Sequence, residues 1–137
     1  MSVPPVEKTL IVVKPDAVAR GFVGEILGRF EKRGMKIVEL RAQTMTWESA
    51  EEFYSVHKGK PFFGELVASF SGGPTVGAVL EGRDAVALVR RMVGATKSWE
   101  SAPGTIRGDL ATGLTDNAIH ASDSKESFER ESKAYFS

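Results

Sequence analysis

Short apolar segments along the chain have the composition of β-strands. Residues 9–13, with the sequence TLIVV, are apolar and largely β-branched, which predicts a central strand covered on both faces. Pro15 would end this strand, because proline has no amide proton to donate to a neighbouring strand. Residues 35–42 and 75–81 predict two further strands, and a short strand is predicted to begin at residues 118–119.

Between these segments, apolar side chains repeat at helical spacing. Val23, Ile26, Leu27 and Phe30 follow the i, i+3, i+4, i+7 pattern of an amphipathic helix, which Gly34 would end. The starts of four further helices are marked by residues typical of a cap or a first turn. These are Thr46, Pro61, Asp84, and Asp123 with Glu126 as a capping box.

Strands that alternate with helices indicate an α/β sandwich, a small sheet with helices packed on it, although periodicity does not set the strand order. The length of 137 residues fits a single domain over residues 1–137, with residues 1–7 as a loose N-terminal arm. Residues 94–117 are rich in Gly, Thr, Ser and Asp and show no clear period. A segment of that length without structure is unusual in a compact domain, so we expect it to be functional.

Composition narrows the chemistry. The chain has no cysteine, which excludes disulfides, thiolate metal sites and a cysteine nucleophile. Eighteen basic residues balance eighteen acidic ones, whereas a general polyanion binder is usually basic. The chain has no apolar run near the ~20 residues of a membrane span and no signal-peptide pattern, so we expect a soluble cytoplasmic protein. Neither a P-loop nor a G-x-G-x-x-G motif is present.

One carboxylate breaks the apolar pattern of the last predicted helix. Phe128 and Tyr135 define its inward face, and Glu131 falls on the same face. A buried carboxylate needs a partner or a raised pKa, and His120 is the candidate partner, directly or through Ser122. A carboxylate that orients one imidazole nitrogen leaves the other basic and free, which is what a histidine nucleophile requires.

The roles suggested for Glu131 and His120 both have alternative interpretations. Glu131 can lie at the edge of the apolar stripe and extend its carboxylate to solvent. His57 competes with His120 for the chemical role, but it shares a helix face with Phe53 and Tyr54. A lone histidine on such a face is more often structural.

Several side chains could hold phosphate. Arginine offers paired donors to phosphate, and lysine offers a point charge. The candidates are Lys14, Arg90 or Arg91, Thr96, Arg107 and Asn117. The apolar pattern does not choose between the two adjacent arginines, and each candidate taken alone can equally be a solvated surface residue. Phe62, on the flank of its helix, could stack on a nucleobase, pack against a loop or form a subunit contact.

Taken together, these segments resemble the nucleoside diphosphate kinase family. The similarity runs from about Lys8 to Phe136. Each motif is short, but all of them in this order and at this spacing are specific. In chain order they are TL at 9–10, KPDAV at 14–18, GEI at 24–26, FYxxH at 53–57, PFF at 61–63, GGP at 72–74, GAT at 94–96, PGTIRGD at 103–109 and NxxHxSDS at 117–124.

The resemblance implies an enzyme that transfers the γ-phosphate of ATP or another nucleoside triphosphate to a nucleoside diphosphate by a ping-pong mechanism. His120 would carry the phosphate, and Ser122 and Glu131 would orient it. The spacing to Thr96 selects Arg90 over Arg91. Phosphate and ribose contacts are implied for Lys14, Tyr54, Arg90, Thr96, Arg107 and Asn117. Phe62 would stack on the base, with Leu114 on its other face, and Mg²⁺ would be held mainly by the nucleotide phosphates.

The resemblance also implies a ferredoxin-like α+β sandwich, with a four-stranded antiparallel sheet covered by helices, and a homo-oligomer, a hexamer or tetramer built from dimers.

Two departures from the family pattern stand out. Ala121 replaces a common glycine, which requires a negative φ there. Lys97-Ser98 replaces Asn-Pro in a loop that helps subunit contacts, so the change bears on assembly or stability. Neither affects the implied catalytic positions.

Two other classes of function compete with this enzyme: a sheet that binds nucleic acid without chemistry, and an inactive scaffold. The zero net charge, and the lack of an aromatic run on a strand, argue against the first, so we expect no obligatory nucleic-acid partner. The retention of every expected polar position argues against the second.

Overall fold

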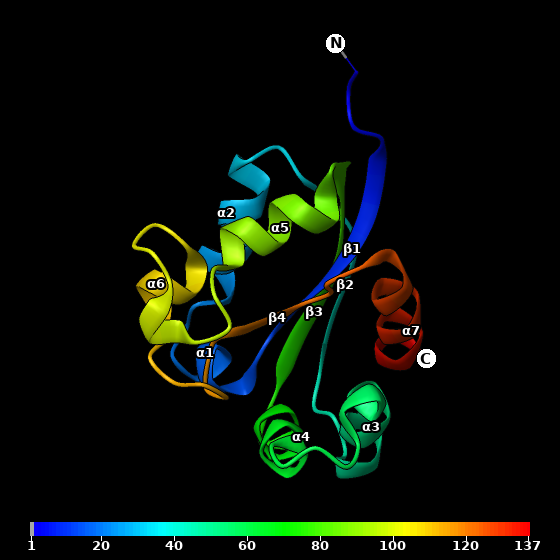
Figure 1. Cartoon of the computed structure of the whole chain (residues 1–137), viewed down its shortest axis with the longest axis vertical. Helices are drawn as coiled ribbons and strands as arrows, with labels where there is room; N and C mark the ends of the chain where they lie inside the picture. The colour runs from blue at the N-terminus through cyan, green and yellow to red at the C-terminus, as the bar shows by residue number, and fades with distance from the viewer. Residues whose placement is uncertain (1) are drawn as a thin grey trace.

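The computed structural model describes residues 2–137 and is built on one four-stranded sheet (Figure 1). The strands are β1 (Val6–Val13), β2 (Lys36–Gln43), β3 (Thr75–Arg83) and β4 (Ile119–Ala121). Their order across the sheet is β2-β3-β1-β4, and every neighbouring pair is antiparallel. The α+β sandwich with an antiparallel sheet is therefore confirmed.

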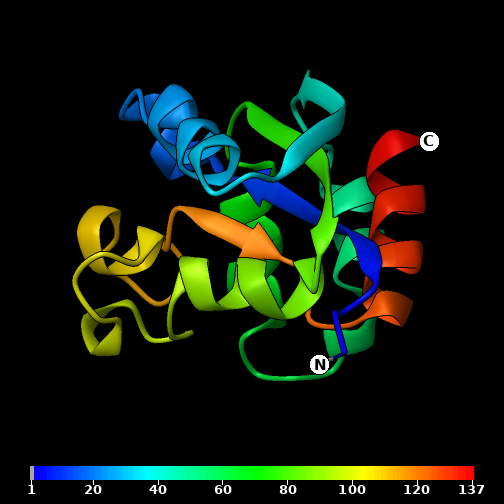
Figure 2. The same ribbon diagram turned by 90° about the horizontal axis from the view of Figure 1, so that it is seen from above.

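Helices cover both faces of this sheet, as Figures 1 and 2 show. The helices are α1 (Pro15–Ala19), α2 (Val23–Lys32), α3 (Trp47–Phe53), α4 (Phe63–Ser71), α5 (Ala85–Val93), α6 (Ile106–Leu110) and α7 (Lys125–Phe136). Short 3₁₀ turns occur at Ser55–His57 and Ser98–Glu100. None of the helices in residues 2–137 has the length and apolarity needed to cross a bilayer.

The two faces follow from the alternation of side chains along β1. Ile11 and Val13 point to one core, which they share with residues of α1, α2, α5 and α6. Leu10 and Val12 point to the other core, formed with α3, α4 and α7. All four side chains are fully buried. The strand is covered on both sides, which is why consecutive residues of β1 are apolar.

The segment 94–117 is more structured than its sequence pattern predicts. It contains the 3₁₀ turn at Ser98–Glu100 and the five-residue helix α6. Thr105 begins α6, because its side chain accepts a hydrogen bond from the amide of Gly108. A helix of little more than one turn is too short to show an apolar period, which is why periodicity missed it.

Three helix starts and the N-terminal arm also differ from expectation in detail. Thr46 caps α3 as predicted, but α7 is capped by Ser124, and Asp84 caps no amide with its side chain. Pro61 precedes α4 and lies outside its first turn. The expected arm is shorter than residues 1–7, because β1 begins at Val6.

Strand β4 places the C-terminal motifs beside the centre of the sheet. His120 lies opposite Val12 in the pairing of β4 with β1. Ala121 is in the strand and is not among the residues with positive φ, so its methyl group is tolerated where a glycine would be common. Ala118, just before the strand, does have a positive φ of 73°.

Candidate active site

The structure brings together the three residues that the last motif singled out. His120, on β4, lies with Nε2 2.7 Å from Oε1 of Glu131, on α7. Ser122 donates its hydroxyl to the same carboxylate oxygen, also at 2.7 Å. Glu131 therefore faces inward and contacts the imidazole directly, and the alternative in which its carboxylate extends to solvent does not apply.

The carboxylate of Glu131 favours its ionised form. Burial tends to raise the pKa of Glu131, but the hydrogen bond and charge of His120, the Ser122 hydroxyl and the charge of Arg130 outweigh it. The net result is a pKa below the ordinary value. An ionised carboxylate accepts from Nε2–H and fixes the tautomer of His120.

Aromatic rings enclose the imidazole on the side of α3 and α4. The ring centroids of Phe53, Tyr54 and Phe70 lie 5.0, 5.7 and 6.5 Å from that of His120, all in edge-to-face arrangements. Within residues 2–137, Nδ1 of His120 makes no hydrogen bond. The ring is thus held by Nε2 and by its neighbours, while Nδ1 stays free.

Lys14 lies at the end of β1, where Pro15 terminates the strand. Its ammonium group donates to the carbonyl of Thr115 and, at 3.1 Å, to Oδ1 of Asn117. Burial lowers the pKa of Lys14 to about 8; the charge of Asp16 raises it and that of Arg107 lowers it further. The group is thus a buried cation that an incoming anion would stabilise.

Arg107 lies on α6 and is almost fully buried. Its guanidinium donates to the carbonyls of Ile119 at 2.7 Å and of Asn117 and Ala95 at 3.3 Å each. Burial, with the nearby charge of Arg90, lowers its pKa to about 10. These contacts tie the segment 94–117 to the start of β4.

The two adjacent arginines of α5 differ in their contacts and in their exposure. Arg90 donates to the carbonyl of Ala121 at 3.3 Å, immediately after His120. Arg91 is 65% exposed and lies 3.9 Å from Asp84. Only Arg90 therefore lies beside the imidazole strand.

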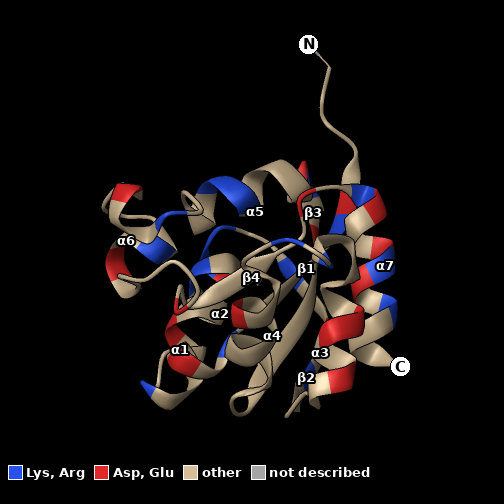
Figure 3. Ribbon diagram, turned by 60° about the horizontal axis from the view of Figure 1, so that its bottom comes forward, with Lys and Arg blue, Asp and Glu red and all other residues tan. Residues whose placement is uncertain are grey.

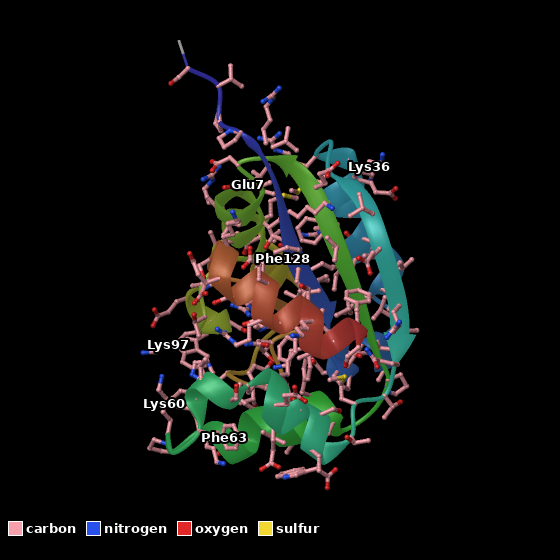
Figure 4. The ribbon with its side chains drawn as sticks, turned by 90° about the vertical axis from the view of Figure 1, so that its right-hand side faces the viewer. Glu7, Lys36, Lys60, Phe63, Lys97 and Phe128 are labelled. Atoms are coloured by element: carbon pink, nitrogen blue, oxygen red, sulfur yellow. The ribbon has the colours of Figure 1, made fainter. Side chains whose placement is uncertain are left out.

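Three further candidate nucleotide-binding residues are exposed at the protein surface. Phe62 is 39% exposed and Leu114 46% exposed, and Thr96 is exposed as well. Phe63, the neighbour of Phe62, packs against the core instead, so the pair divides as its helix pattern predicts. In Figure 4, Lys60 and Lys97 both project from the same side of the molecule.

His57 lies apart from the carboxylate. Its Nδ1 is 3.2 Å from the ammonium of Lys60, and its ring centroid is 5.6 Å from that of Phe62. Burial and then the charge of Lys60 lower the pKa of His57. It therefore lacks the acid partner that His120 has.

Comparison with known proteins decides the family. A family model described as nucleoside diphosphate kinase matches residues 7–137. The chain belongs to the nucleoside diphosphate kinase family. A nucleoside diphosphate kinase of Hyperthermus butylicus is 53% identical over 133 residues, covering 97% of this chain and 94% of that protein. One from Pyrococcus furiosus is 54% identical over 134 residues, covering 96% of this chain and 83% of that protein.

Solved structures of nucleoside diphosphate kinases have the same fold. The Aquifex aeolicus enzyme superposes with a TM-score of 0.94 at 50% identity, covering 97% of this chain and 96% of that one. The Halobacterium salinarum enzyme, solved in complex with CDP, gives a TM-score of 0.92 at 42% identity, covering 96% and 88%.

Two further residues contact the cluster around His120, and the sequence alone predicted a role for neither of them. Asp16 accepts the amide of Ala118 at 3.1 Å and so holds the turn with positive φ before β4. Arg130 lies 3.4 Å from the second oxygen of Glu131. The KPD motif drew attention to Asp16 without a role, whereas no periodic signal distinguishes Arg130 from other charged residues of its helix.

Proposed function

We propose that this chain transfers the γ-phosphoryl group of a nucleoside triphosphate to a nucleoside diphosphate through a phosphohistidine on His120. One observation carries the proposal: Nε2 of His120 is held by Glu131, while Nδ1 has no partner within residues 2–137. The ring is thereby oriented with one basic nitrogen available for attack. Membership of the nucleoside diphosphate kinase family supports the same reaction.

The reaction proceeds in two halves. Nδ1 attacks the γ-phosphorus in line, a nitrogen–phosphorus bond forms, and the bond to the oxygen of the departing diphosphate breaks. The proton on Nε2 stays in its hydrogen bond to Glu131, whose negative charge stabilises the phosphorylated ring. A second nucleoside diphosphate then attacks the phosphorus and restores the neutral imidazole, which gives ping-pong kinetics.

The cations around β4 are suited to the charge that develops on the phosphates. Arg107 and Arg90 hold the carbonyls of Ile119 and Ala121, the residues on either side of His120. Lys14 and Asn117 are joined in the same cluster. We assign Lys14, Arg90 and Arg107 to the phosphates, because preorganised cations in a partly buried site stabilise such charge most.

The exposed residues Phe62, Leu114 and Thr96 are suited to binding a nucleoside. Phe62 and Leu114 expose apolar surface that could hold the two faces of a base, and stacking accepts any base. We assign Thr96, Tyr54 and Asn117 to the phosphate and ribose. The Halobacterium salinarum relative solved with CDP supports a nucleoside diphosphate as ligand.

Magnesium fits this site as a companion of the nucleotide. In residues 2–137 no group of three or more His, Cys, Asp or Glu residues could hold a metal ion. The donors around His120 are mainly cationic, so phosphate oxygens would be the principal ligands of Mg²⁺. When bound, the ion would offset phosphate charge during transfer.

We further propose a cytoplasmic homo-oligomer built from dimers, a tetramer or hexamer, with residues 1–137 as one domain. The outer strand β2 exposes Leu40, and Trp47 beyond it is also exposed, so an unpaired sheet edge with exposed apolar side chains is open to a second copy. In the ribbon of Figure 3, α7 carries both basic and acidic residues, which favours no obligatory nucleic-acid partner.

Labelling with γ-labelled ATP tests the function. We expect wild-type protein to form an acid-labile, base-stable phosphoprotein that discharges onto added nucleoside diphosphate. His120→Asn should form none, whereas His57→Ala, the matched control at the other histidine, should still be labelled. Normal turnover by His120→Asn would falsify the assignment. A salt-sensitive shift with single-stranded DNA, unchanged by loss of His120 and without labelling, would favour the binding module instead.

A further inference from the structure

The second carboxylate oxygen of Glu131 has a partner of its own. Oε1 receives both His120 and Ser122, whereas Oε2 lies 3.4 Å from Nη2 of Arg130. Arg130 is the preceding residue of α7, and 37% of its side chain is exposed.

The guanidinium of Arg130 is not extended freely into solvent. Its Nε is covered by protein and has no hydrogen-bond partner within residues 2–137. Covering a polar nitrogen without a partner costs free energy, so an exposed side chain would keep Nε in water unless another contact compensated. Among residues 2–137, the hydrogen bond to Glu131 is the one that this guanidinium makes.

We propose that Arg130 is a positioning residue for the transfer at His120, holding Oε2 of Glu131 so that Oε1 stays directed at both Nε2 of His120 and Oγ of Ser122. This inference rests on the proposed function of His120. The terminal torsion of a glutamate is broad and two-fold, so hydrogen bonds rather than sterics must fix the carboxylate plane. Two partners on one oxygen and a third on the other fix it more firmly than the first two alone.

Arg130 also limits the negative charge that the imidazole faces. After transfer the phosphorylated ring carries a positive charge on the side of Glu131, because the proton remains on Nε2. The guanidinium beside Oε2 offsets part of that carboxylate charge. The phosphorylated imidazole is therefore stabilised less, and its phosphoryl group is transferred more readily to a nucleoside diphosphate. The other titratable groups around the carboxylate are Tyr54 and His57, on which the charge of Glu131 also acts.

The test compares Arg130→Met with Arg130→Lys, and with Lys133→Met as a control for loss of one exposed positive charge on the same helix. Two quantities are measured: the equilibrium between phosphoenzyme and ATP at fixed ADP, and the pH dependence of the phosphorylation rate. For Arg130→Met we expect about threefold more phosphoenzyme at equilibrium, as befits a partly exposed ion pair. We also expect the acid limb of the rate to move up by about half a pH unit. Arg130→Lys and Lys133→Met should both behave as wild type.

Unchanged equilibrium and an unchanged acid limb in Arg130→Met would overturn the proposal, even if its free energy of unfolding fell, because a purely structural role would alter only stability. If Arg130→Met does not fold, Arg130→Gln, which is shorter and polar but also lacks the charge, carries the same two expectations. Absence of phosphoenzyme in the wild type would instead refute the proposed function, so the two failures are distinguishable.

Discussion

At the scale of single residues, the site depends on which atom of each side chain is engaged. Glu131 uses one oxygen for both His120 and Ser122, and the imidazole keeps one nitrogen free. The sequence made His120 a candidate partner of Glu131, directly or through Ser122, because Glu131 falls on the apolar face of the last predicted helix. The contacts of Arg130 with Glu131 and of Asp16 with Ala118 could not be predicted, since neither leaves a mark in the apolar period.

The buried lysine sets an upper pH limit for nucleotide binding. Because burial lowers the pKa of Lys14 to about 8, the free protein loses this charge above that pH. We expect kcat/KM, which reports the free enzyme, to fall above pH about 8. Lys14→Arg should move this basic limb to higher pH, and Lys14→Met should lower kcat/KM by about 100-fold. A basic limb that stays in place in Lys14→Arg would show that another group sets it.

Glu131 should also contribute to stability in a pH-dependent way. Its folded pKa lies below the ordinary value of 4.5, so its contribution is present above that pH and is lost as pH falls through the folded value. We expect Glu131→Gln to be less stable by about 2 kcal/mol at pH 7 and to show less of the wild-type fall in acid. Urea unfolding between pH 7 and 3 measures this. Parallel curves for the two proteins would contradict it.

At the scale of elements, segments with a clear apolar pattern were predictable, including the start of the short strand β4, whereas helix α6 was not. The strands around residues 9–13 and 75–81 were expected from short runs of apolar side chains, and the helix beginning at Val23 from apolar side chains at helical spacing. Helix α6 has five residues and depends on the Thr105 cap and the contacts of Arg107, which are tertiary. The α7 cap fell on Ser124 because neighbouring polar residues offer several possible starts.

Two helices begin with the same kind of threonine cap, and comparing the two caps distinguishes an effect on stability from an effect on nucleotide binding. Thr46 caps α3 and Thr105 caps α6, each through its hydroxyl oxygen. Replacing either by alanine should cost about 1 kcal/mol of unfolding free energy. Thr105→Ala should in addition raise KM for nucleotide several-fold, because α6 carries Arg107, while Thr46→Ala should raise KM less, because Thr46 lies at the opposite end of α3 from Tyr54. Denaturation curves and steady-state kinetics check this, and equal KM values in the two variants would contradict it.

At the scale of the whole molecule, the sheet divides the protein into two cores and brings distant segments to one place. Lys14 from the end of β1, Arg90 from α5 and Arg107 from α6 all meet β4 and the loop before it. The strand order that produces this meeting could not be read from periodicity, which gives faces but not neighbours.

The open edge at β2 predicts association. We expect light scattering of purified protein to give four or six times the 14.8 kDa mass of one chain. Leu40→Lys, which places a charge on the exposed edge strand, should lower that mass toward the monomer. A monomeric wild type, or a Leu40→Lys oligomer of unchanged mass, would show that this edge is not the interface.

The most direct test of the central claim is to locate the phosphoryl group on the protein after incubation with ATP and Mg²⁺. Phosphorus NMR of the phosphoenzyme, together with mass spectrometry of its peptides under alkaline conditions, identifies both the residue and the ring nitrogen. The free nitrogen of the imidazole predicts phosphate on Nδ1 of His120. Phosphate on Nε2, on His57 or on a serine would contradict the account.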